Sequence, residues 1–230
     1  MIKKTEANVT SPLPDREGLG ESLFPSYYLA PISYYARLLQ CDSYCIDTNE
    51  IYRKQTLYNR CYIASPNGPL ALTIPVVKFV PYHTPLRDIR ISDHGNWRHL
   101  HWNALQSSYG RTPFFEFYAD DFAPFYEKRW DFLVDYNQAL QEMICELIGM
   151  NSLPHSLTSP FTFHPSPFTH NPSPFTLHPS TFNLHPSPFT LHPYYQLFSD
   201  RHGFMPDLSI VDLLFNMGPE SILYLNNLQS

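Results

Sequence analysis

The chain has 230 residues, which suits one domain of ordinary size, and it is 43% apolar but only 16% charged. The formal net charge of −6 argues against a general nucleic-acid-binding protein, and eight scattered glycines form no glycine-rich phosphate loop. No apolar run approaches the ~18 residues of a membrane span. Four cysteines without a CxxC pair favour reduced thiols over a disulfide scaffold.

The first 22 residues are polar and contain no apolar segment like that of a secretory signal. We therefore expect a disordered tail over residues 1–22 and a cytoplasmic protein.

Short elements are predicted in the part of the chain that follows. A proline at its start and apolar residues at helical spacing predict a helix over residues 31–40. Strands are predicted over residues 43–47, 60–64, 70–77 and 86–92, the middle two joined as a hairpin by Ser65-Pro66-Asn67-Gly68.

Helices are predicted after these strands in the sequence. Residues 96–109 are one candidate, and residues 131–148 carry apolar side chains at helical spacing and are followed by Gly149. Near the end of the chain, Ser209 and Asp212 resemble a capping box ahead of an apolar helix, which Gly218-Pro219 ends before another helix begins. Strands in the first part of the chain and helices after them predict a single α/β or α+β domain.

A proline-rich tract interrupts this pattern. Residues 151–193 hold ten of the 23 prolines and six of the 11 histidines, with no charged residue. A seven-residue unit, His164-Pro165-Ser166-Pro167-Phe168-Thr169 and the residue after it, recurs with starts at 171, 178, 185 and 192. Two prolines in most units disfavour helices and strands, so we expect a disordered insertion. The alternatives are a tolerated repeat expansion, a peptide-recognition segment and a loose histidine metal tract.

Charge is distributed unevenly along the predicted core. Residues 53–98 contain seven bases and two acids, whereas residues 99–150 contain three bases and eight acids. A basic, strand-rich half in an acidic protein suggests a site for a small anion, such as a phosphate or carboxylate. The alternative is that the two regions pair with each other at the surface.

An ordered series of motifs resembles the WbqC-like family, in the form found in Bacteroidetes. The similarity spans residues 26–228 outside the repeat tract. The motifs are Tyr34-Tyr35-Ala36-Arg37-Leu38-Leu39, Lys54-Gln55-Thr56-Leu57-Tyr58-Asn59-Arg60-Cys61, Leu72-Thr73-Ile74-Pro75-Val76, Ile89-Arg90-Ile91, Asn96-Trp97, His101-Trp102, Tyr109, Pro113-Phe114-Phe115-Glu116, Tyr194-Tyr195-Gln196-Leu197-Phe198, His202-Gly203-Phe204 and Leu208-Ser209-Ile210-Val211-Asp212-Leu213-Leu214-Phe215-Asn216.

Composition and the resemblance together divide the chain into four segments. They are the tail (1–22), an α/β core (23–150), the disordered repeat insertion (151–193) and C-terminal helices that complete the domain (194–230). The family takes its name from a gene of surface-polysaccharide (O-antigen) clusters, so the resemblance implies chemistry on nucleotide-activated or amino sugars. It supplies no established catalytic residues and names no cofactor.

Candidate site residues are donors for an anion and one group that titrates near neutrality. Lys54, Asn59, Arg60 and Arg90 are predicted to bind the anion, with Tyr34 in a strand-to-helix turn of the kind that binds ligands. His101 is the candidate proton carrier, although a packed histidine is the alternative. His99 and His101 point apart on a helix, and HExxH and paired-cysteine patterns are absent, so no metal site is predicted.

Two functions fit these observations. The first is an enzyme of polysaccharide biosynthesis, a transferase that acts on a nucleotide-activated amino sugar. The second is a non-catalytic binding or assembly module for enzymes of a glycan pathway, with aromatic surface as its interface. We expect Asn59, Arg60, Arg90 and His101 to converge on one concave surface, because they lie in or beside the basic half and within the stretches that carry the resemblance.

Overall fold

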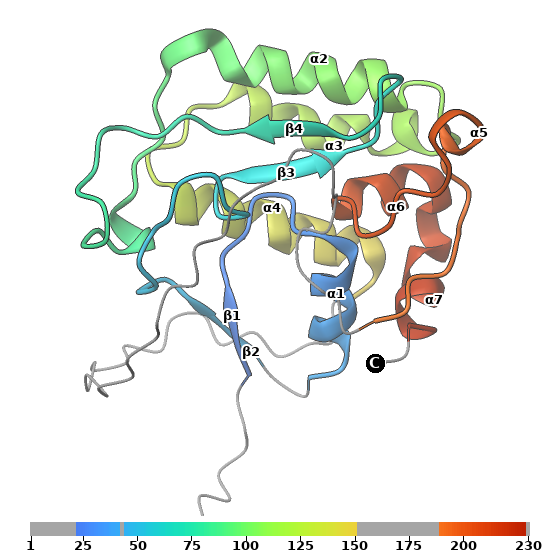
Figure 1. Cartoon of the computed structure of the whole chain (residues 1–230), viewed down its shortest axis with the longest axis horizontal. Coiled ribbons are helices and arrows are strands. Elements are labelled where there is room, and N and C mark those ends of the chain that lie inside the picture. The colour runs from blue at the N-terminus through green and yellow to red at the C-terminus, as the bar shows by residue number, and fades with distance from the viewer. Residues whose placement is uncertain (1–21, 42–43, 151–188, 229–230) are drawn as a thin grey trace, which may run out of the picture.

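A computed structural model describes residues 22–41, 44–150 and 189–228 (Figure 1). The expected tail, apart from Ser22, and the repeat tract up to residue 188 lie outside the described residues. The fold is mixed α/β, as predicted. The strands lie in the N-terminal half of the described chain, and most helices follow them in the sequence. The strands are β1 (Ser22–Pro25), β2 (Tyr44–Asp47), β3 (Arg60–Ile63) and β4 (Leu70–Thr73). The helices are α1 (Ile32–Leu39), α2 (Trp97–Tyr109), α3 (Phe115–Glu127), α4 (Leu133–Ile148), α5 (Ser199–His202), α6 (Ile210–Met217) and α7 (Ser221–Asn226), with short 3₁₀ turns η1 (Leu86–Asp88), η2 (His94–Asn96) and η3 (Gly218–Glu220).

The first unit of the fold is a β1–α1–β2 crossover. The two strands pair in parallel, with Ser22 opposite Tyr44 and Pro25 opposite Asp47, so their carboxyl ends meet at one edge. Pro31 precedes α1 with a φ of −67°, which suits a helix start. The predicted helix over 31–40 is confirmed by α1, and the strand predicted over 43–47 is confirmed by β2 at the described residues 44–47.

The amino end of α1 is capped from the far end of the chain. Asp207 accepts hydrogen bonds from the Ser33 backbone N–H and from the Ser33 hydroxyl, both at 2.9 Å. Asp207 adopts a φ of +53° to do so. A carboxylate at a helix amino terminus is stabilised by the helix dipole.

The second sheet is the predicted antiparallel hairpin of β3 and β4. Arg60 lies opposite Thr73, and Ile63 lies opposite Leu70. Ser65 and Gly68 exchange both backbone hydrogen bonds across the turn, where Gly68 has a φ of +99° that favours glycine. Cys61 and Ile63 face the core, whereas Arg60 and Tyr62 lie on the partly exposed face.

The strand predicted over residues 86–92 does not form. Residues 86–88 are the 3₁₀ turn η1, and only isolated bridges, such as Val76 to Ile91, follow. The physical reason is the spacing of the apolar residues. Leu86 and Ile89 are three residues apart and both are buried, which fits a 3₁₀ turn better than the alternation of a strand.

Three long helices follow, of which α3 was not predicted. Pro124 lies inside α3 and cannot donate a backbone hydrogen bond to the Asp120 carbonyl. Both residues are exposed, so water can replace the lost donor. The predicted helices over residues 96–109 and 131–148 are confirmed by α2 and α4, and Gly149 ends α4 with a φ of +84°.

The C-terminal helices belong to the same core as the strands. α6 packs against α1, α2 and α3, and α7 packs against α1 (Figure 1). The residues of α6 from Ile210 to Asn216 are all buried. The last described part of the repeat tract also reaches the core, because Phe189 is buried and the His192 carbonyl accepts a hydrogen bond from the Tyr224 hydroxyl.

Asp212 does not act as the predicted capping-box acid. Ser209 caps α6, but its backbone N–H donates to the Tyr62 carbonyl instead of to Asp212. The fully buried Asp212 carboxylate accepts hydrogen bonds from Tyr109 at 2.8 Å, Tyr194 at 2.5 Å and Gln196 at 2.8 Å. This one side chain therefore connects α6 with α2 and with the segment before α5.

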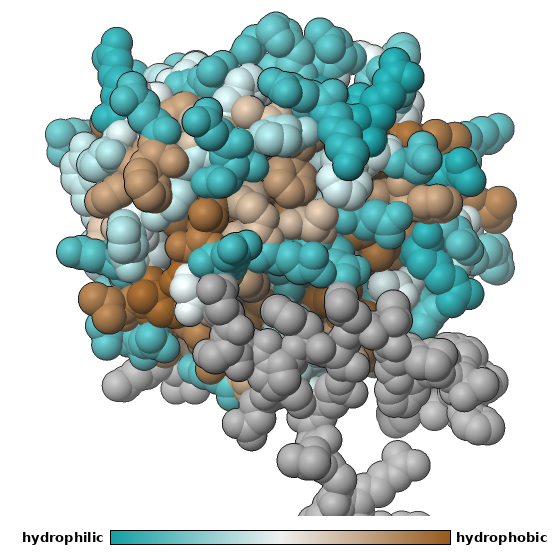
Figure 2. All heavy atoms as spheres, turned by 180° about the vertical axis from the view of Figure 1, so that it is seen from behind, coloured by the Kyte–Doolittle hydropathy of each residue, from teal (hydrophilic) through white to brown (hydrophobic). Residues whose placement is uncertain are grey.

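The surface is mixed in character. On the face opposite to that of Figure 1, apolar side chains form an irregular band between polar ones (Figure 2). Within the described residues, no helix is both long enough and apolar enough to cross a membrane.

The hydrogen bonds of Asp212 predict that a substitution of nearly the same size will lower the free energy of unfolding. Asp212→Asn replaces one acceptor oxygen by a donor, which leaves at least one buried donor without a partner. We expect a loss of about 1–3 kcal/mol in the free energy of unfolding, measured by chemical denaturation. Asp200→Asn, an exposed change in α5, serves as the matched control and should have little effect. Equal stability of the two variants would contradict this role.

Candidate functional site

A group of polar and aromatic side chains lies at the carboxyl edge of the parallel strand pair. Tyr27 follows the end of β1, and Glu50 follows the end of β2. The Asp47 carboxylate shapes the second turn, since it accepts hydrogen bonds from the backbone N–H groups of Asn49 (2.8 Å) and Glu50 (3.2 Å). In open α/β sheets, ligands bind in the crevice outside the carboxyl ends of the strands.

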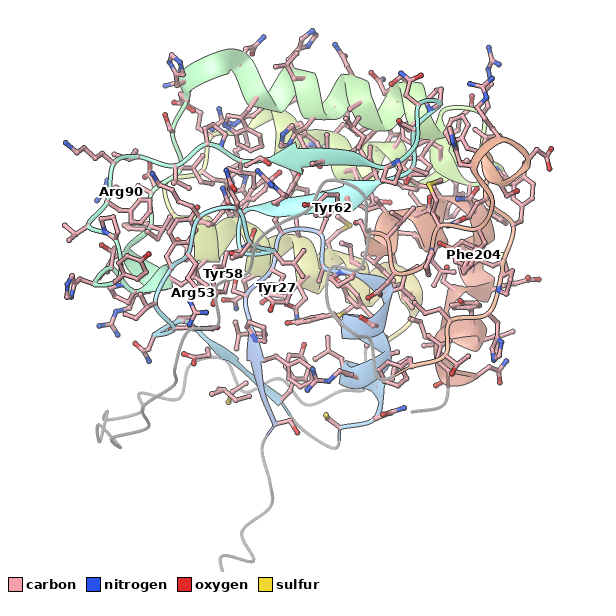
Figure 3. The ribbon with its side chains drawn as sticks, viewed as in Figure 1. Tyr27, Arg53, Tyr58, Tyr62, Arg90 and Phe204 are labelled. Atoms are coloured by element: carbon pink, nitrogen blue, oxygen red, sulfur yellow. The ribbon has the colours of Figure 1, made fainter. Side chains whose placement is uncertain are left out.

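Two tyrosines flank Glu50. The Tyr58 hydroxyl lies near the Glu50 carboxylate, and the Tyr27 and Tyr58 rings lie 5.8 Å apart. Burial, then the nearby Glu50 carboxylate, raises the pKa of Tyr58, while the Arg53 charge opposes this shift. Burial and the Glu50 charge also raise the pKa of Tyr27. We call Tyr27, Glu50, Arg53 and Tyr58 the Glu50 cluster. Figure 3 shows Tyr27, Arg53 and Tyr58 close together.

Two further cations lie next to this cluster, around Tyr52. The Tyr52 ring is 6.0 Å from Tyr58 and 4.8 Å from Phe79. The Lys54 ammonium lies 5.4 Å from the Phe79 ring centre. Burial raises the pKa of Tyr52 to about 12, while the nearby Arg60 charge lowers it. Cations and aromatic faces thus stand beside a carboxylate, an arrangement that can bind an anionic group and a ring together.

The predicted site residues fall into two groups. Lys54 and Arg60 lie beside the Glu50 cluster, and the buried Tyr34 ring is 5.6 Å from Tyr27. Asn59 is buried, and its amide donates to the Ile74 carbonyl at 2.7 Å. Arg90 is exposed, stacks over Phe132 at 4.8 Å, and lies away from Tyr27 and Tyr58 in Figure 3.

His101 lies in the core, with 5% of its surface exposed. Its Nδ1 atom is 3.0 Å from the Tyr28 hydroxyl, which lies 3.1 Å from the Tyr126 hydroxyl. Burial lowers the pKa of His101 to about 4, although a hydrogen bond to the Thr73 backbone opposes this shift. Arg60 reaches the same residue, since its Nε donates to the Thr73 hydroxyl at 2.8 Å. The predicted joint site of Asn59, Arg60, Arg90 and His101 remains a prediction.

Comparison with known proteins assigns this chain to a family. The model of the WbqC-like protein family matches residues 25–165. The chain belongs to the WbqC-like protein family. One WbqC-like relative is the "Uncharacterized protein Rv1507c" of Mycobacterium tuberculosis, which is 26% identical over 226 residues, 89% of this chain and 96% of the relative. No solved structure matches this WbqC-like chain.

The residues of the Glu50 cluster of this WbqC-like protein were not predicted as a site from the sequence: Tyr27, Glu50, Arg53 and Tyr58 were not predicted as site residues. Their one sequence signal is the mixture of charged and aromatic residues between the strands predicted at 43–47 and 60–64. In the part of the chain that the structure describes, no group of three or more His, Cys, Asp or Glu side chains could hold a metal ion.

The buried imidazole predicts a pH-dependent stability. The folded-state pKa of His101 lies near 4, below the ordinary value of 6.5, so folding favours the neutral ring. This contribution to stability is present above pH 6.5 and is lost as the pH falls towards 4. The full loss is about 3 kcal/mol.

Denaturation curves between pH 7 and pH 4 test this expectation. His101→Gln should show a shallower fall in the free energy of unfolding than the unmodified protein. His99→Gln, at an exposed position of the same helix, should keep the original slope. Identical slopes in all three proteins would refute the assignment.

Proposed function

We propose that this WbqC-like protein is a transferase of surface-polysaccharide biosynthesis that acts on a nucleotide-activated amino sugar. The observation that carries the proposal is the Glu50 carboxylate near Tyr27 and Tyr58, with Arg53 beside Tyr58 and Arg60 near Tyr52. The location of this group at the carboxyl ends of β1 and β2 supports a ligand site. A cytoplasmic location is part of the proposal and is supported by four cysteines that are thiols and not disulfides.

The cations suit the charged half of such a substrate. Arg53 and Arg60 would neutralise the diphosphate, and their guanidinium groups can each donate two hydrogen bonds to phosphate oxygens. Lys54 would add a third positive charge from beside Phe79. The tyrosine rings would contact the base or the sugar ring, since both present flat faces to aromatic side chains.

The carboxylate suits the chemical step. In a transfer from an activated sugar, an acceptor hydroxyl or amine attacks carbon C1, the bond from C1 to the diphosphate breaks, and the acceptor loses a proton. Glu50 would accept that proton as a general base, and the arginines would stabilise the negative charge on the departing diphosphate. His101 remains a second candidate for the proton carrier, and the His101→Gln variant tests it in the same assay.

Thermal denaturation with nucleotide sugars tests binding. UDP-N-acetylglucosamine and related nucleotide-linked hexosamines are the probes, with UDP alone as a reference. A ligand at 100 times its dissociation constant stabilises by about 2.7 kcal/mol, which raises the melting temperature of a protein of this size by roughly 5–10 °C. Arg60→Ala should weaken binding by about 10-fold or more, because a charged hydrogen bond contributes about 1.5–3 kcal/mol.

Arg111→Ala, at an exposed position just after α2, is the matched control and should bind like the unmodified protein. If no nucleotide sugar stabilises the chain, the non-catalytic binding module is favoured instead.

Glu50→Gln separates binding from chemistry. The amide keeps the size of the side chain but cannot accept a proton at neutral pH. We expect nearly unchanged binding of the nucleotide sugar and a fall in turnover of about 10²–10⁴-fold, the usual contribution of a general base. Release of the nucleoside diphosphate measures turnover. Unchanged turnover would remove Glu50 from the mechanism.

A further inference from the structure

Eight buried side-chain atoms, all outside the Glu50 cluster, have no hydrogen-bond partner in the described part of the protein. Four of them belong to neighbouring side chains: Arg98 Nε, Arg98 Nη2, Trp130 Nε1 and the Tyr136 hydroxyl. Each of these four can donate a hydrogen bond. The Tyr136 hydroxyl is near enough to Tyr126 to influence its pKa, yet it has no partner at hydrogen-bonding distance. We call Arg98, Trp130 and Tyr136 the Arg98 cluster.

The three side chains come from different elements and are connected through the Trp97 and Tyr136 rings. The Arg98 guanidinium carbon lies 4.8 Å from the Trp97 ring centre, and the Trp97 and Tyr136 rings are 5.8 Å apart. The Trp130 ring lies 5.6 Å from the Tyr136 ring. Burial raises the pKa of Tyr136, and the Arg98 charge is close enough to oppose that shift. The first turn of α2, the loop before α4 and α4 itself therefore contribute one donor group each.

Only one of the three guanidinium nitrogens of Arg98 has a hydrogen-bond partner in the described part of the protein. Its Nη1 atom donates to Asp93 at 2.6 Å, on the outer side, where Asp93 is about half exposed. Nε and Nη2 remain, and together they form the edge of the guanidinium that binds two oxygens of one carboxylate or phosphate side by side. The Arg98 side chain is 14% exposed, so this free edge is largely withdrawn from water.

Leaving these donors unpaired is costly. A buried donor without a partner loses its hydration and gains nothing in return, and the cost is higher for a charged group. Such groups in a native protein call for an explanation, commonly an ordered water or an ion. Because all four atoms can donate and one of the groups is a cation, their natural complement is an anion with several acceptor oxygens.

We propose that the Arg98 cluster binds a small oxyanion, a carboxylate or phosphate group, through Arg98 Nε and Nη2, Trp130 Nε1 and the Tyr136 hydroxyl. The site shares no residue with the Glu50 cluster, and the inference does not rest on the proposed transferase activity. Ordered water is the competing occupant, and it predicts no dependence of stability on an anion.

Titration of the full chain with inorganic phosphate tests the site. The melting temperature is followed at constant ionic strength, with sodium chloride as the salt control and sodium acetate as the carboxylate probe. We expect a saturable rise of several degrees with phosphate, acetate or both, and none with chloride. The probe with the lower half-saturation concentration identifies the preferred oxyanion.

Single-atom and charge-conserving variants locate the response. Tyr136→Phe removes only the hydroxyl, so without an anion it should fold with nearly unchanged stability. It should nevertheless raise the half-saturation concentration by about 5-fold or more. Arg98→Lys keeps the charge but loses the two-donor edge, and we expect it to abolish the response. Tyr82→Phe and Arg111→Lys change the same residue types at exposed positions and should respond normally.

Two results would overturn the proposal. One is the absence of a saturable response to phosphate and acetate beyond that to chloride. The other is a response that survives unchanged in both Tyr136→Phe and Arg98→Lys. Arg60→Ala distinguishes the two sites, because it should weaken nucleotide-sugar binding at the Glu50 cluster and leave the response of the Arg98 cluster intact.

Discussion

The buried carboxylate of Asp212 is the contact on which the arrangement of the other elements depends. Its three donors come from α2 and from the segment before α5, and every residue of its own helix except Met217 is buried. Tyr109 extends the connection, since its hydroxyl also accepts a hydrogen bond from the Ala64 backbone at 3.0 Å. A charge that is removed from water requires well-placed partners, so this network fixes where α6 meets the hairpin of β3 and β4.

The position of the hairpin in turn determines the candidate site. β3 alternates between buried and partly exposed residues, so fixing its inner face against α2 and α6 directs Arg60 to the outer face. Tyr58 lies just before the strand and meets Tyr27, which follows β1. The Glu50 cluster therefore arises where a parallel pair and an antiparallel hairpin meet. Its residues are close in space because two small sheets share one core.

The parts of the fold that the sequence could predict are those with a strong local signal. Pro31 and Gly149 mark helix ends through their backbone preferences, and Ser65–Gly68 marks the hairpin turn. The helix α3 was missed because Pro124 normally ends a helix, and here its exposure makes the lost hydrogen bond tolerable. Lys54 and Arg60 could be named from residue type alone. Glu50 could not, because its role depends on the pairing of β1 with β2.

The cap on α1 affects the order in which the parts of the fold form during synthesis. Ser33 and Asp207 are separated by 174 positions, and their contact closes almost the whole described chain upon itself. Contacts of such long range form late, because the chain must first lose the entropy of closing a long loop. During synthesis from the amino terminus, the first helix therefore emerges with its cap still untranslated. A ribosome-bound nascent chain would keep the apolar face of α1 uncovered until α6 and α7 have followed.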